Sequence, residues 1–205
     1  MAYKFLELAS TPSVRAAQAA NGSLEIWQQL EANRAFDRFT NREAAFIGAR
    51  DSFYMATVSE TGWPYVQHRG GAPGFLKVID PTTLGFADFR GNRQYISVGN
   101  ATANDRVALI LMDYPNRARL KILAHLEVKS LTEDPALAAR LTTPGYKAKP
   151  ERGLLLHLET FDWNCPQHIT PRFTAPEIDA AIEPLRARVA ALEAENAALR
   201  GASDR

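Results

Sequence analysis

Residues 53–71 read FYMATVSETGWPYVQHRGG, two short runs rich in β-branched and aromatic residues on either side of a turn at Gly62. Runs of this length and composition, joined by a glycine-containing turn, are typical of an antiparallel hairpin. Similar runs recur as far as Trp163, and most are separated by turn residues. The strands that we predict are 53–58, 65–69, 75–79, 83–87, 106–113, 119–130 and 154–163.

The density of these strands indicates how they pair. Parallel strands need a long crossover connection, and most of these runs are joined by tight turns, so we expect antiparallel pairing in a barrel or sandwich. The chain then divides into an N-terminal helical segment (1–50), a β domain (51–173) and a C-terminal helix (174–205). The fold class expected is mainly β (α+β).

Three helices are expected outside the C-terminal segment, besides a helical pattern before residue 40 with Leu24, Trp27 and Leu30 on one face. Thr40 followed by Glu43 is a capping box, which predicts a helix over 41–49. Two others are predicted over 91–100, after a glycine turn, and over 134–141, where proline takes the first helical position.

The segment after Pro176 has the spacing of a coiled coil. Apolar residues recur at alternating intervals of four and three, with one asparagine in the series. A seam of this kind is typical of two parallel helices, and a single asparagine at position a usually specifies two strands. Position a holds Ile182, Val189 and Asn196, and position d holds Ile178, Leu185, Leu192 and Leu199.

The charges beside this seam are complementary between two chains. Arg188 at position g would face Glu193 at position e of a partner, and Glu195 would face Arg200 in the same way. The alternative is one amphipathic helix packed on its own barrel, because a seam of this length is marginal by itself. Pro184 is expected to kink or restart the helix.

Composition excludes several classes of protein. The net charge of +1 provides no basic field for nucleic acid or anionic lipid, so neither is expected as a partner. Cys165 is the only cysteine, which excludes an intramolecular disulfide and a multi-cysteine metal site. No signal peptide or membrane span is visible, so a cytoplasmic location is expected. No metal is expected either, because no set of ligands for one is visible.

The segment Phe86-Ala87-Asp88-Phe89-Arg90-Gly91-Asn92-Arg93-Gln94 is the best candidate for an anion site. A strand ends, a glycine turn follows and a helix is predicted to begin, so free backbone N–H groups would point at a ligand. Arg90 and Arg93 add guanidinium groups suited to phosphate. Taken alone, these arginines could equally be solvated.

Three segments in this order resemble the pyridoxamine 5′-phosphate oxidase-related FMN-binding proteins. They are FYMATVSETGWPYVQHRGG (53–71), LGFADFRGNRQYISVGN (84–100) and RVALILMDYPNRARLKILAHLEV (106–128), and the resemblance covers approximately 45–165. It implies an antiparallel split β-barrel, a homodimer with FMN at the subunit interface, and redox chemistry on a small-molecule substrate.

The resemblance also implies which residues bind the cofactor. By position, four residues of the second strand would edge the flavin ring and ribityl chain: Gln67, His68, Arg69 and Gly70. Asn92 and Arg93 would hold the phosphate, and Arg90 could supplement them. Arg119 falls where the family supplies a side chain from the later hairpin. Gln167 and His168 lie in the loop after the last strand and are candidates for contact with substrate or flavin.

The chain departs from the true oxidases at informative positions. Those enzymes carry an arginine where Gln67 stands and an Arg-Lys pair where Asn92 and Arg93 stand. The segment WNCPQHITPRF (163–173) lacks their Trp…Pro-x-Arg pattern, so a substrate other than pyridoxamine phosphate is expected. The alternatives to an FMN-dependent oxidoreductase are a non-catalytic flavin or haem binder and a deazaflavin-dependent reductase.

Overall fold

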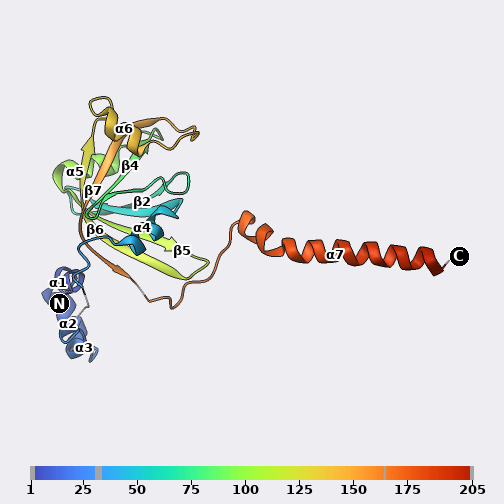
Figure 1. Ribbon diagram of the computed structural model, residues 1–205. Coiled ribbons are helices and arrows are strands. Elements are labelled where there is room, and N and C mark those ends of the chain that lie inside the picture. Colours follow the sequence, from blue (N-terminus) through green and yellow to red (C-terminus); the bar gives the residue numbers. More distant parts are fainter. Residues whose placement is uncertain (1–2, 31–33, 164, 204–205) are drawn as a thin grey trace.

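The computed structural model describes residues 3–30, 34–163 and 165–203. Its centre is one sheet of seven antiparallel strands (Figure 1). The order across the sheet is β2-β1-β5-β6-β7-β4-β3, and the end strands β2 and β3 are not paired with each other. The strands are β1 (Ser52–Val58), β2 (Pro64–Gly70), β3 (Lys77–Asp80), β4 (Thr83–Phe89), β5 (Arg106–Asp113), β6 (Ala118–Lys129) and β7 (Pro150–Trp163).

The sheet curls into an open barrel around an apolar core. Alternate residues along β1 and β5 point inward, and Phe53, Met55 and Leu111 are almost fully buried. Phe53 on β1 meets Phe86 on β4 edge to face, with 5.3 Å between the ring centroids, although β1 and β4 are far apart in the strand order. The predicted mainly β, antiparallel fold is therefore confirmed, as a barrel that is not closed.

Short helices lie around this barrel. The predicted capping box is present, since the Thr40 hydroxyl accepts from the helix amide at Arg42 while Glu43 accepts from the Thr40 amide. Asp134 caps the helix that begins at Pro135, as the sequence predicts. The helices before the last one are α1 (Lys4–Ala9), α2 (Pro12–Ala20), α3 (Leu24–Gln28), α4 (Asn41–Gly48), α5 (Ile96–Ala103) and α6 (Pro135–Leu141).

The last helix, α7 (Ala175–Ser203), extends away from the barrel (Figure 1). It continues through Pro184, so of the two outcomes predicted at this residue, a kink or a restart, the restart does not occur. Within the described residues, no helix combines the length and apolarity needed to cross a bilayer.

Several predicted boundaries also differ. The helix expected over 91–100 begins only at Ile96, because the residues before it form an irregular turn in which Arg93 and Tyr95 have left-handed backbones. The last strand begins at Pro150, where pairing with β4 extends it. The N-terminal segment forms three short helices, and Trp27 and Leu30 of its predicted face are 44% and 42% exposed. Residues 31–33 of that segment lie outside the described residues.

Candidate functional site

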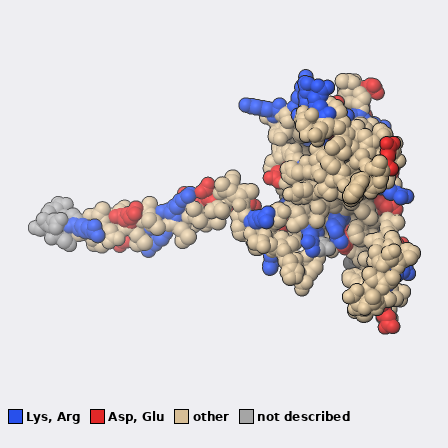
Figure 2. All heavy atoms as spheres, turned by 180° about the vertical axis from the view of Figure 1, so that it is seen from behind, with Lys and Arg blue, Asp and Glu red and all other residues tan. Residues whose placement is uncertain are grey.

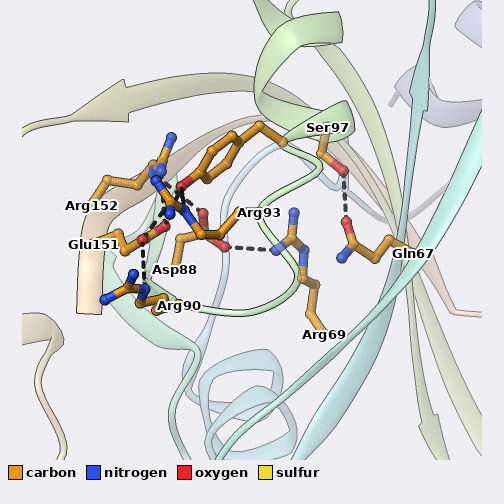
Figure 3. A network of polar contacts seen from close by, with 9 residues as sticks. Gln67, Arg69, Asp88, Arg90, Arg93, Ser97, Glu151 and Arg152 are labelled. Atoms are coloured by element: carbon orange, nitrogen blue, oxygen red, sulfur yellow. Dashed lines mark hydrogen bonds and ion pairs between the residues drawn. The ribbon is translucent and has the colours of Figure 1, made fainter. Parts of the chain in front are cut away.

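A small polar pocket lies where β2, the end of β4, the start of α5 and the start of β7 meet (Figure 3). Its volume is about 50 Å³, which suits a phosphate-sized anion and not a whole flavin. The polar side chains that line it are Gln67, Arg69, Asp88, Asn92, Arg93, Tyr95, Ser97 and Glu151.

Strand β2 contributes alternate side chains to this pocket. Gln67 and Arg69 are half-buried and line it, because residues two apart in a strand point to the same face. His68, between them, points to the opposite face and packs against Tyr54, with ring centroids 5.4 Å apart. Of the side chains predicted on this strand, Gln67 and Arg69 therefore line the pocket of their own chain, and His68 does not.

Arg69 reaches across the open barrel to β4. Its Nη1 atom donates to Asp88 Oδ1 at 2.7 Å, and Arg152 Nε on β7 lies 3.4 Å from Asp88 Oδ2. Burial raises the pKa of the Asp88 carboxyl above its ordinary value and outweighs the opposite influence of the two arginines. Asp88 is thus a buried acid held between two guanidinium groups.

The turn before α5 carries the predicted phosphate residues. Asn92 accepts from the amide of Gln94 through its side chain, which tightens the turn. Arg93 has φ +61°, a strained backbone for a residue with a side chain, and its exposed guanidinium lies at the mouth of the pocket. The predicted helix start at this point is wrong, so Asn92 and Arg93 belong to a loop.

The start of α5 nevertheless contributes to the pocket. Ile96, Ser97 and Val98 form its first turn and line the pocket, and first-turn N–H groups have no acceptor inside a helix. Ser97 Oγ donates to Gln67 Oε1 at 3.1 Å, which fixes the orientation of the Gln67 amide. The free N–H groups that we predicted for a helix starting at residue 91 are therefore present, but at the start of α5, five residues later.

A second acid, Glu151, connects the remaining arginines. Tyr95 accepts from Arg93 Nε at 3.1 Å and donates to Glu151 at 3.2 Å. Arg152 donates to Glu151 at 3.1 Å, and Arg90 Nε lies 3.9 Å away at the rim. The carboxylate therefore holds three cationic side chains around one edge of the pocket.

The charges and unsatisfied donors of this cluster favour an anion. Arg69, Arg90, Arg93 and Arg152 surround two carboxylates, which leaves a net charge of +2. The Nε atom of Arg69 is buried without a hydrogen-bond partner, and the Nε atom of Arg152 has only its 3.4 Å ion pair with Asp88. Buried donors of charged groups normally have acceptors, so an oxygen-rich anion would complete this cluster.

The other predicted site residues lie elsewhere in the chain. Gly70 pairs with Ser52 at the end of β2. Arg119 lies on β6 opposite Met112, with its Nε buried and without a hydrogen-bond partner. Gln167 and His168 are exposed in the loop after β7, and none of these residues lines the pocket. Asn164, at the start of that loop, lies outside the described residues.

Asp88, Tyr95, Ser97, Glu151 and Arg152 are the members of the cluster that sequence reasoning missed. Asp88 lies inside the segment singled out for its arginines, and Tyr95 and Ser97 lie just after it, where the search for cations passed over an acid and two hydroxyls. Glu151 and Arg152 could be found only from the register of β4 on β7, in which Asp88 is opposite Arg152.

The outer face of β1, β2 and β5 is apolar and open. Val66 is 61% exposed and Tyr54 41%, and Trp63 at the turn is 76% exposed. Beside them lies a hollow of about 560 Å³ whose lining is largely apolar, with Ala56, Val58 and Ala108 among it, and also includes Arg106, His125 and Glu159. An exposed apolar face of this kind marks an interaction site in a folded protein. Among the described residues, no cluster of acidic, histidine or cysteine side chains could hold a metal ion.

A family model described as pyridoxamine 5′-phosphate oxidase matches residues 39–154. The matched part contains the pocket residues from Gln67 to Glu151 and ends inside β7, so the loop after β7 and α7 lie beyond it. No curated protein matches the sequence.

Solved structures resemble the barrel at low sequence identity. A Lactobacillus delbrueckii protein described provisionally as a pyridoxamine 5′-phosphate oxidase is 23% identical over 62% of this chain and 94% of its own, with a TM-score of 0.47. HupZ of Group A Streptococcus is 13% identical over 66% of this chain and 100% of its own, with a TM-score of 0.46. An FMN-binding protein of Syntrophomonas wolfei is 15% identical over 73% of this chain and 97% of its own, with a TM-score of 0.42.

Proposed function

The chain belongs to the pyridoxamine 5′-phosphate oxidase family, and from this premise we propose that it is an FMN-binding oxidoreductase that acts on a small molecule as a homodimer. The observation that carries the proposal is the pocket between β2, β4 and α5, which Arg69 and Arg93 line while Arg90 and Arg152 lie beside its two acids. The net charge of +2 of this cluster, the partnerless Nε of Arg69 and the first-turn amides of α5 together suit a dianionic phosphate.

Within this pocket, Arg69 and Arg93 are the residues that would grip the phosphate. Arg69 is already oriented by Asp88, so the entropy lost on binding is small. Arg93 is held at the mouth by its hydrogen bond to Tyr95. Gln67, fixed by Ser97, would offer an amide edge to the ribityl chain or the ring. Asn92 would shape the turn, and Arg90 would add charge at the rim.

The flavin ring would lie outside the phosphate pocket, because about 50 Å³ cannot contain it. The open apolar face beside β1 and β2 supports a second subunit there, as dimers of the family have it. His68 on that face would meet the ring or the partner. Arg119, Gln167 and His168 would then act from the partner subunit, since none of them lines the pocket of their own chain.

FMN, when bound, would supply the transfer of hydride or electrons between substrate and acceptor. The chain's own residues would anchor the phosphate, present hydrogen bonds to the ring and limit the access of water. No acid or base is assigned a proton transfer. The substrate is proposed to differ from pyridoxamine phosphate, because Gln67 and Asn92 replace cations and the loop after β7 lacks the substrate-recognition pattern.

The test is the spectrum of the purified full chain. We expect a yellow protein that releases FMN on denaturation and is bleached by NAD(P)H or by an oxidisable substrate from a screen. A yellow protein that no reductant or substrate turns over would support the alternative of a non-catalytic flavin binder. A colourless protein that takes up neither FMN nor riboflavin but binds the deazaflavin F420 or haem would contradict the assignment of FMN.

A further inference from the structure

Helix α7 carries an apolar stripe that its own chain leaves uncovered. The helix has 29 residues and a length of about 44 Å at 1.5 Å per residue. Ile178, Leu185, Val189 and Leu192 are 47%, 66%, 54% and 38% exposed. Figure 2 shows α7 standing clear of the barrel, with acidic and basic side chains along a largely uncharged surface. These four residues therefore do not pack on the barrel of their own chain, which was the alternative that the sequence left open.

We propose that this stripe is the seam of a parallel two-stranded coiled coil formed with α7 of a second copy of the chain. The stripe follows heptad positions a and d over three heptads, which is the pattern that two helices bury together. Pairing would cover the seam that water now contacts. The proposal does not rest on flavin binding, since α7 lies outside the family match.

The flanking charges select a second copy as the occupant. In parallel register, Arg188 at position g faces the partner's Glu193 at position e, and Glu195 faces the partner's Arg200. Within the described part of the chain, Arg188 and Glu193 form no ion pair, whereas Arg186 binds Asp179 in its own helix at 3.2 Å. Two pairs of opposite charge are therefore available to the same partner sequence.

Asn196 specifies the direction of pairing. In a parallel coiled coil, a residue at position a packs against the same position of the partner, so two Asn196 amides can hydrogen-bond. In an antiparallel pair, position a faces position d, and Asn196 would lie against an apolar side chain with an unsatisfied amide. The asparagine thus favours the parallel, in-register arrangement.

The start of the helix is fixed without any help from a partner. Thr174 donates to Glu177 through its amide at 2.7 Å and its hydroxyl at 2.8 Å, and Arg172 lies over the Tyr114 ring at 4.9 Å. The first two contacts cap the helix, and the third ties the residues just before it to the turn between β5 and β6. Pro184 falls at position c, away from the seam, so it removes a helix hydrogen bond without blocking the pairing.

Disulfide cross-linking of the full chain tests the proposal. In a Cys165→Ser background, which has no other cysteine, Val189→Cys places a thiol at position a and Ala190→Cys places one at position b. Under mild oxidation, Val189→Cys is expected to form a covalent dimer about tenfold faster than Ala190→Cys, because only the seam brings two Cβ atoms to disulfide distance. Leu192→Cys at position d should behave like Val189→Cys.

Equal cross-linking at positions 189 and 190, or none at either seam position, would overturn the proposal. Packing against the chain's own barrel, antiparallel pairing and binding to a different partner all give no selective link at position 189. The same cross-linking carried out with Arg93→Ala should be unchanged, since that variant affects only flavin binding. Failure of the coiled coil and failure of the flavin site are therefore separate results.

Discussion

At the scale of single residues, the site is a set of arginines held in place by two acids. Asp88 holds Arg69 and Arg152, and Glu151 holds Arg152 and, through Tyr95, Arg93. The guanidinium groups are oriented before any ligand arrives, and the buried Nε donor of Arg69 has no hydrogen-bond partner. The left-handed backbone of Arg93 is costly and is retained where the side chain must reach the pocket mouth.

Asp88→Asn tests this role of the acids. Because burial outweighs the two arginines in the pKa of Asp88, its charge does not stabilise the free fold, and we expect the folding free energy to change by no more than about 1 kcal/mol. Arg69 and Arg152 would then lack a counter-charge that a bound phosphate can supply, so saturating FMN should raise the Tm of Asp88→Asn more than that of the wild type. Asp37→Asn, at an exposed acid outside the pocket, is the control. An equal rise of Tm with FMN in Asp88→Asn and in the wild type would contradict the account.

At the scale of elements, the sequence predicted the strands well and the helix starts unevenly. All seven strands were found, because alternation and turns are local signals, and the Thr40–Glu43 cap is a local motif too. The start of α5 was placed five residues early, since nothing local announces the strained turn at Arg93. Glu151 and Arg152 were missed because they join the site only through the pairing of β4 with β7.

The capping residue Glu43 also joins α4 to other elements. It accepts from Thr40, from Arg34 at 2.8 Å and from Trp163 Nε1 at 2.8 Å, while its side chain is fully buried. Burial acts to raise the pKa of this carboxyl, but the hydrogen bonds from Thr40, Trp163 and Arg34 outweigh it and lower the pKa from 4.5 to about 2. One ionised side chain thus connects the N-terminal segment, α4 and the end of β7.

Glu43 should therefore make stability depend on acid pH. A carboxylate with a lowered pKa in the folded state stabilises the fold above pH 4.5, and this contribution is lost as the pH falls towards 2. Urea unfolding should show the wild type more stable than Glu43→Gln by about 3 kcal/mol at pH 6. The difference should nearly vanish near pH 2. A constant difference across this range would mean that charge is not the cause.

At the scale of the whole molecule, apolar side chains are exposed on the outer face around Val66 and along the seam of α7. The first adjoins the strand that lines the phosphate pocket, and the second lies on a separate arm. A second copy of the chain is proposed to cover both. The sequence indicated the helix seam through its heptads, whereas the sheet face became visible only when the strand register was known.

Val66→Asp separates the two surfaces. A carboxylate buried between apolar faces is strongly unfavourable, so we expect the barrels to part and FMN to be lost. Light scattering should still give twice the 22.7 kDa chain mass, because α7 remains paired, and adding Val189→Asp should give the monomer.

Val128→Asp, at an exposed valine near the end of β6, is the matched control and should keep its flavin. Full FMN retention by Val66→Asp would contradict the role of the outer face. A monomer from Val66→Asp alone would agree with that role and contradict the pairing of α7.

The central claim is that Arg69 and Arg93 hold the phosphate of FMN, and it is tested most directly by titrating the flavin-free protein with FMN and with riboflavin, which lacks the phosphate. We expect FMN to bind about 100-fold more tightly than riboflavin. Arg93→Ala should reduce this preference by at least about tenfold and leave the affinity for riboflavin unchanged. The control Arg38→Ala should change neither affinity. Equal affinities for FMN and riboflavin in the wild type, or an Arg93→Ala variant that weakens both equally, would contradict the account.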